Sequence, residues 1–166
     1  AVIGTDLYLG GRFGNFPGGV YGEAAFIARW DTVNEQWHSV GGGLSAQVRT
    51  LAVSGTDLYV GGDFQNAGSA NGDRIVRWDG VAWNALGTGL SASVRAIAVA
   101  DEGVYAGGDF LNAGNANGDR IALWNGANWQ PLATGLSSTV YALAVSDDGL
   151  YAGGNFILAG TQTCNG

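Results

Sequence analysis

Hydrophobic residues alternate with polar or small residues over short stretches of this chain, and the same stretches return at regular intervals. One complete set is VRTLAVS at 48–54, LYVGGDF at 58–64, RIVRW at 74–78 and AWNAL at 82–86. These stretches are rich in β-branched, aromatic and aliphatic residues, and Gly, Asp, Asn or Ser bound them. No stretch shows a convincing 3.6-residue apolar period. The pattern predicts an all-β protein with little or no helix.

The four stretches form a repeating unit. LYVGGDF returns as VYAGGDF at 104–110 and LYAGGNF at 150–156, and LYLGGRF at 7–13 precedes it. The last three copies are 46 residues apart, whereas the first precedes the second by 51, with three of the extra residues in GNFPGGVYGEAAF. Four antiparallel strands at this period predict β-propeller blades. We expect one incomplete propeller domain over 1–166, with units at about 3–53, 54–99 and 100–146 and a partial unit at 147–166.

The first strand of each unit has one small and one bulky face. In VRAIAVA at 94–100, alternation places Val94, Ala96 and Ala98 on one face and larger residues on the other. A thin face against a bulky one lets adjacent blades interdigitate, so this strand fits nearest the axis. The tryptophans are predicted to pack between blades, the alternative being a platform for ligand stacking. They are Trp30, Trp37, Trp78, Trp83, Trp124 and Trp129.

Glycines have two predicted uses. Asp79-Gly80 and Asn125-Gly126 predict primed hairpin turns between the third and fourth strands, because such turns need residues that tolerate positive φ. The glycine pairs at 61–62 and 107–108 predict a bulge or a close approach of neighbouring strands. A phosphate cradle is disfavoured because no helix N-terminus follows them.

The order glycine pair, aromatic residue with Asp, then Trp resembles the kelch repeat. In the second unit it is carried by Gly61-Gly62, Trp78-Asp79 and Trp83. The resemblance extends over essentially the whole chain, although Trp stands where kelch repeats usually have Tyr. The residue pattern of the repeat is also similar to repeat runs of large secreted or surface-displayed bacterial proteins. The resemblance therefore implies a kelch-like propeller in an extracellular or cell-surface setting.

The number of strands indicates an incomplete ring. About fourteen strands, or three and a half blades, are expected, whereas propellers have roughly four to eight blades. The last blade would then expose a strand edge. A fragment of a longer chain is favoured by the mid-repeat start and the missing initiator Met. The alternative is that two copies pair their half-blades into a closed ring.

Charge excludes several partners. The net charge is −7, there is no lysine, and the seven arginines form no basic stripe, which argues against binding nucleic acid or anionic membranes. No apolar run approaches the ~18 residues that a spanning segment needs, so membrane insertion is not expected. The single cysteine, Cys164, cannot form an internal disulfide.

Catalytic groups are sparse. His38 is the only histidine, and no Ser or Cys lies in a recognisable nucleophile elbow. The acidic pairs Asp101-Glu102 and Asp147-Asp148 fall in tight turns, where acidic residues are common turn formers. We expect neither an enzyme nor a zinc site, because one histidine and one distant cysteine cannot ligate the metal.

The candidate site is the long polar connection that follows each glycine pair, at 65–74 and 111–120. Loops of this kind on a rigid scaffold often bind ligands, and these share a propeller face with the turns at 87–93 and 133–139. Asp73-Arg74 and Asp119-Arg120 could instead cap the loops and pair across blades. The candidate residues are Asp63, Asn66, Asn71, Asp73, Arg74, Asp109, Asn112, Asn117, Asp119 and Arg120.

No cofactor is expected. Asn115, Asn117 and Asp119 at alternate positions leave calcium as an alternative, although Asx turns explain the same residues. The pattern favours a non-catalytic binding or scaffold module that binds a protein partner or another copy of itself. One alternative is a structural subunit whose open blade a partner completes by strand addition. The other is a glycan-binding or glycan-active propeller.

Overall fold

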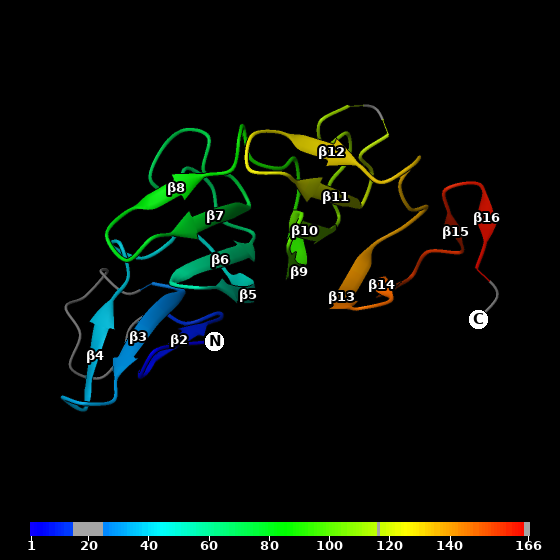
Figure 1. Ribbon diagram of the computed structural model, residues 1–166. Coiled ribbons are helices and arrows are strands. Elements are labelled where there is room, and N and C mark those ends of the chain that lie inside the picture. The colour runs from blue at the N-terminus through cyan, green and yellow to red at the C-terminus, as the bar shows by residue number, and fades with distance from the viewer. Residues whose placement is uncertain (15–24, 116, 165–166) are drawn as a thin grey trace.

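The computed structural model describes residues 1–14, 25–115 and 117–164. Among these residues there are strands and no helix, which confirms the all-β class (Figure 1). It follows that none of them forms a helix able to cross a membrane. Most of GNFPGGVYGEAAF, where three of the extra residues of the first repeat were placed, lies outside the described residues.

Three four-stranded antiparallel sheets follow one another along the chain, each in simple meander order. The first sheet comprises β1 (Val2–Ile3), β2 (Asp6–Gly10), β3 (Ile27–Asp31) and β4 (Gln36–Ser39). The second comprises β5 (Val48–Ser54), β6 (Asp57–Gly62), β7 (Ile75–Trp78) and β8 (Trp83–Ala85). The third comprises β9 (Val94–Ala100), β10 (Gly103–Gly108), β11 (Ile121–Trp124) and β12 (Trp129–Pro131).

Two hairpins complete the described chain. They are β13 (Val140–Ser146) with β14 (Gly149–Gly154), and β15 (Leu158–Ala159) with β16 (Gln162–Thr163). The second was not predicted, because its residues align with a loop in the other units. It is joined to the chain leaving the third sheet by a bridge between Leu136 and Ala159.

The sheets are arranged side by side in an arc (Figure 1). β9 contacts β5 on one side and β13 on the other, so the first strands of successive units are neighbours. This arrangement is compatible with blade-like repeats. The described strands do not close into a barrel or ring.

The core lies between sheets rather than within one. Val48, Leu58 and Val60 of the second sheet pack with Tyr8 and Ile27 of the first. An equivalent cluster joins the third sheet to the second through Val94, Val104, Ala106, Ile75 and Leu86. Because both faces of a sheet can be apolar only when neighbours cover them, burial ties each sheet to the next.

A bulge changes the predicted face of Val94. The register between β9 and β10 shifts between Gly107 and Gly108, so strict alternation fails after Val94. Val94 and Ile97 therefore both face Gly61 of the preceding sheet. The thin and bulky faces exist as predicted, but Val94 belongs to the bulky one.

The glycine pairs occupy positions of close approach, as predicted. A Cβ at Gly61 would lie 2.6 Å from Cγ1 of Val94, and one at Gly107 would lie 2.6 Å from Cγ1 of Val140. Both distances are shorter than real Cβ contacts. Each glycine thus makes room for the valine that begins the first strand of the next sheet.

The tryptophans of the second and third sheets pack against the preceding sheet, as predicted. The third- and fourth-strand tryptophans of each sheet form tilted pairs with ring centroids 5.0–5.5 Å apart. Trp83 Nε1 donates to Gly41 O at 3.3 Å, and Trp129 Nε1 donates to Leu86 O at 2.9 Å. Both acceptors lie on the connection that leaves the preceding sheet.

The β7–β8 turn differs from the primed turn that was predicted. Gly80 has φ +96° as expected, but Asp79 does not adopt positive φ. Trp78 pairs with Trp83, so the loop has four residues rather than two. Asp79 Oδ1 accepts the N–H groups of Val81 and Ala82, which forms an Asx turn.

Candidate functional site

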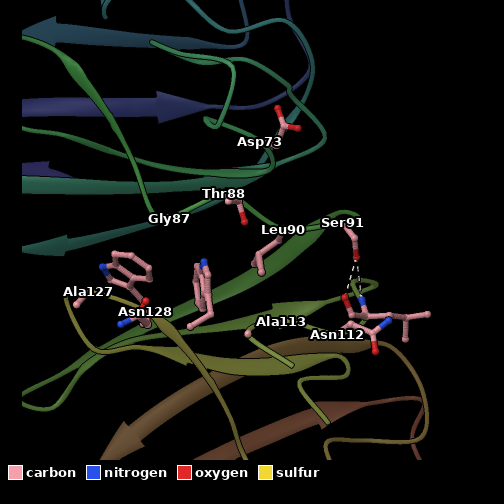
Figure 2. Close-up of a pocket in the computed structure, with 14 residues that line it drawn as sticks. Asp73, Gly87, Thr88, Leu90, Ser91, Asn112, Ala113, Ala127 and Asn128 are labelled. Carbon is pink, nitrogen blue, oxygen red and sulfur yellow. Dashed lines mark hydrogen bonds between the residues drawn. The ribbon is translucent and has the colours of Figure 1, made fainter. Parts of the chain in front are cut away.

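Parts of the predicted loops and of the 87–93 turn line a cleft of about 480 Å³ between the second and third sheets (Figure 2). One wall is the 87–91 connection with Asp73, and the other is the 111–114 stretch with Ala127 and Asn128. Trp124 and Trp129 also line the cleft. The expectation that these two kinds of connection share one face is confirmed here.

The loops hold their shape through side-chain acceptors. Asp73 Oδ1 accepts the N–H of Asn66 at 2.8 Å, and Asp119 Oδ1 accepts that of Asn112 at 2.8 Å. Asn66 and Asn112 have φ of +57° and +59°, a region that Asn tolerates better than most residues. The loop aspartates are therefore internal braces as well as candidate ligand contacts.

Ser91 fixes one wall of the cleft to the other. Its Oγ donates to Leu111 O at 3.0 Å and accepts the N–H of Leu111 at 3.0 Å, as Figure 2 shows. Ser45 makes the same pair of bonds with Gln65 in the preceding unit. This hydroxyl holds the connection and the loop together, which makes the cleft preformed.

Several polar groups in the cleft remain available to a ligand. The side chains of Thr88, Asn112 and Asn128 make no hydrogen bond within the described part of the chain, and all three residues are exposed. Amide and hydroxyl groups can both donate and accept, and they lie beside the half-buried Trp124. These three uncharged side chains can therefore form hydrogen bonds with a polar ligand in the cleft.

Asp63 and Asp109 do not line the cleft but form ion pairs near the inner strands. Arg49 donates to Asp63 through Nε at 2.8 Å and through Nη2 at 2.7 Å. Arg95 donates to Asp109 through Nε at 2.8 Å, and its Nη2 lies 2.8 Å from the same oxygen. Each aspartate also accepts a hydroxyl from the residue that precedes the first strand of the next sheet.

Those hydroxyls join adjacent sheets. Ser93 Oγ donates to Asp63 Oδ1 at 2.5 Å, and Thr139 Oγ1 donates to Asp109 Oδ1 at 2.7 Å. Hydrogen bonds from Arg49 lower the pKa of Asp63 despite partial burial. Burial acts to raise the pKa of Asp109, but hydrogen bonds from Arg95 and Thr139 outweigh it and the pKa is lowered.

Arg74 and Arg120 act within their own sheets. Arg74 Nη1 donates to the backbone oxygen of Asp63, and Arg120 Nη1 donates to that of Asp109 at 2.6 Å. The possibility that the Asp-Arg dipeptides pair across blades through these arginines is therefore not what the structure shows. Asp63 and Asp109 are instead bonded to the following sheet by the hydroxyls of Ser93 and Thr139.

The remaining candidates lie at the loop tips. Asn71 and Asn117 are exposed and outside the cleft. Asn115 Oδ1 accepts the N–H of Asn117 at 2.8 Å, as the Asx-turn interpretation requires. Within the described residues, no three His, Cys, Asp or Glu side chains gather as metal ligands would.

Glu102, one of the acidic turn residues, has an ordinary hydrogen-bond partner. Tyr105 donates from its hydroxyl to Glu102 Oε1 at 2.6 Å. This bond, together with burial, raises the pKa of Tyr105 to about 12. His38 Nε2 lies 3.8 Å from Asp31 Oδ2 on neighbouring strands.

Sequence reasoning missed Thr88, Ser91 and Asn128 as residues of the cleft. Thr88 and Ser91 lie on the connection before β9 and Asn128 lies on the β11–β12 turn, and only the packing of two sheets brings these two segments together. The repeat of Ser at 45, 91 and 137 was a usable signal, since a hydroxyl kept at a 46-residue period suggests a repeated structural bond. The sequence matches no protein-family model, and no curated protein is significantly similar to it.

Proposed function

We propose that this chain is a non-catalytic binding module of an extracellular or cell-surface protein, and that its sheets are blades of a kelch-like β-propeller. The ligand engages the face formed by the 65–74 and 111–120 loops. A protein partner presenting a polar surface segment is the favoured ligand, and a glycan is the alternative. The single observation that carries the proposal is the cleft beside Trp124, with its unpaired amide and hydroxyl groups.

The build of the cleft supports binding. Its frame is fixed by the Ser91 bonds and by Asp119, so little order has to be gained when a ligand arrives. Thr88 and Asn128 supply the free polar groups on opposite walls. A rigid cleft with a few unpaired polar groups and an aromatic side chain is typical of recognition sites. The lysine-free, acidic composition agrees with the proposed extracellular setting.

The test is a binding screen with a matched variant pair. The wild-type chain is applied to an array of extracellular proteins and to a glycan array, with and without calcium. The cleft variant is Thr88→Ala with Asn128→Ala, which removes two exposed groups that make no side-chain hydrogen bond in the fold. The control is Asp147→Ala with Asp148→Ala, on the β13–β14 turn. We expect any ligand found to bind the cleft variant at least tenfold more weakly and the control unchanged.

Two results would contradict the proposal. If no member of either array binds, the module has no ligand of the proposed classes. If a ligand binds and the cleft variant retains full affinity while the control loses it, binding uses the opposite face. A ligand confined to the glycan array and sensitive to the cleft variant would select the glycan alternative.

A further inference from the structure

The glycine that receives a neighbouring valine recurs at a 46-residue period in the last three units. Gly61 receives Val94, and Gly107 receives Val140, each within 2.6 Å of the position a Cβ would take. Gly153 is the next glycine in this series. A Cβ on Gly153 would meet only Cβ of Ala142, at 3.9 Å. We call the space over such a glycine, which a valine side chain occupies, the valine seat. This seat is present at Gly153, and nothing in the described chain fills it.

The sheet surface around this seat is exposed where its counterparts are buried. Tyr105 is 9% exposed, whereas Tyr151, its equivalent on β14, is 57% exposed. Ala96 and Ala98 on β9 are buried, whereas Ala142 and Ala144 on β13 are exposed. The four residues Ala142, Ala144, Tyr151 and Gly153 are here called the forward face of β13–β14.

A side-chain hydrogen-bond acceptor lies next to the valine seat in each of the last three units. Asp63 Oδ1 and Asp109 Oδ1 each accept a hydroxyl from the residue that precedes the seated valine. Asn155 holds the equivalent position, and its Nδ2 donates to Tyr141 Oη at 3.0 Å. Its Oδ1 has no partner among the described residues. The forward face thus offers a site for a hydroxyl next to the site for a valine.

We propose that the forward face of β13–β14 is a docking surface for the first hairpin of a further repeat of this sequence type. The recognised feature is a Ser or Thr followed by Val at the start of the docking strand. The valine packs over Gly153 and the hydroxyl donates to Asn155 Oδ1. This surface is separate from the cleft of the proposed function and does not depend on it.

The favoured occupant follows from the residues that fill the equivalent seats. Ser93-Val94 and Thr139-Val140 both have the required order, and both are already seated on their own chain. A second copy of this chain would instead have to present its first sheet, where Leu7 and Leu9 are 39% and 42% exposed. That surface is apolar but offers no Ser-Val or Thr-Val pair, so a repeat hairpin is the better fit.

The test uses a labelled peptide with the sequence of residues 92–108, which spans the β9–β10 hairpin with Ser93 and Val94. Its binding to the full chain is measured by fluorescence anisotropy. We expect saturable binding that weakens at least tenfold when the peptide carries Val94→Asp. We expect the same loss for the protein variant Gly153→Ala, because the added Cβ occupies the valine seat.

Stability controls separate a blocked seat from a damaged fold. Gly153→Ala should leave the chemical-denaturation midpoint unchanged, since its Cβ meets only an ordinary contact. Gly107→Ala should lower the midpoint clearly, because its Cβ would overlap Val140. Gly14→Ala, whose Cβ would meet nothing within 4 Å, is the matched control that should keep full peptide affinity.

Three outcomes would overturn the proposal. The first is no peptide binding at any accessible concentration. The second is binding that Gly153→Ala and Val94→Asp leave unchanged. The third is concentration-dependent dimerisation in sedimentation equilibrium that Gly153→Ala abolishes, which would make a second copy the occupant.

Discussion

At the scale of single residues, one side-chain oxygen decides each outer turn. Asp79 Oδ1 accepts the N–H groups of Val81 and Ala82, both at 2.9 Å. Asn125 Oδ1 makes the same two bonds in the third sheet, to residues 127 and 128. The turn therefore requires a side-chain oxygen at this position, but it does not require a negative charge. The charge adds a pH dependence, because these backbone bonds and one from Asn84 lower the pKa of Asp79 to about 2.

Asp79→Asn is expected to keep the turn and remove that pH dependence. The folded-state pKa of Asp79 lies below its ordinary value of 3.8, so ionisation stabilises the fold above about pH 4. This contribution is lost as the pH falls toward 2. The variant should be less stable than wild type at pH 7, and the difference should shrink toward zero near pH 2. Urea unfolding across this range measures it, and a difference that does not change with pH would contradict the explanation.

At the scale of elements, the outer strands of the second and third sheets are each attached to the preceding sheet through an indole. Trp129 on β12 is 8% exposed and donates to Leu86 O at 2.9 Å. Trp83 on β8 makes the equivalent bond to Gly41 O at 3.3 Å, and it is only half-buried. The same element is thus attached more firmly in the third sheet than in the second.

Trp129→Phe should cost more stability than Trp83→Phe. Loss of the buried N–H leaves Leu86 O with one donor fewer, and such a change costs about 1–3 kcal/mol. The longer, partly solvated bond of Trp83 should matter less, because water can replace it. Free energies of unfolding from urea titrations give the comparison. Equal losses would mean that ring packing rather than the hydrogen bond sets the cost.

At the scale of the whole molecule, each sheet is stabilised by its neighbours. β9 and β10 are covered on both sides, by the second sheet and by β13, whereas β13 and β14 are covered on one side only. Stability in such arrays depends on intrinsic repeat terms and on interfaces with nearest neighbours. Local unfolding should therefore be easier in β13–β14, which is covered on one side, than in β9–β10.

Hydrogen exchange should reveal this gradient. Backbone amides of β13–β14 are expected to exchange faster than the equivalent amides of β9–β10, because fewer buried contacts must break to open them. Exchange mass spectrometry on peptides covering 94–108 and 140–154 gives matched segments of equal length and similar sequence. Equal protection of both segments in the monomer would show that packing between sheets contributes little.

The repeat made much of the fold predictable. Gly61 indicated a close approach of strands and Trp83 indicated packing between sheets, because each residue recurs at a fixed place in the repeat. The turn at Asp79 was misjudged in length, since a four-residue Asx turn and a two-residue primed turn use the same residue types. The cleft was predicted only through its loops, because Thr88 and Asn128 come to line one cleft only when two sheets meet.

By itself the sequence determined the all-β class, the strand order within each unit and the glycines that admit a neighbour, because these follow from local alternation and a 46-residue period. Only the tertiary structure decided that Val94 turns to the bulky face, that Ser93 and Thr139 join adjacent sheets, and that the seat over Gly153 is open. These features depend on a register shift or on contacts between distant residues. Neither a register shift nor a contact between distant residues can be recognised from the hydrophobic pattern of a single strand.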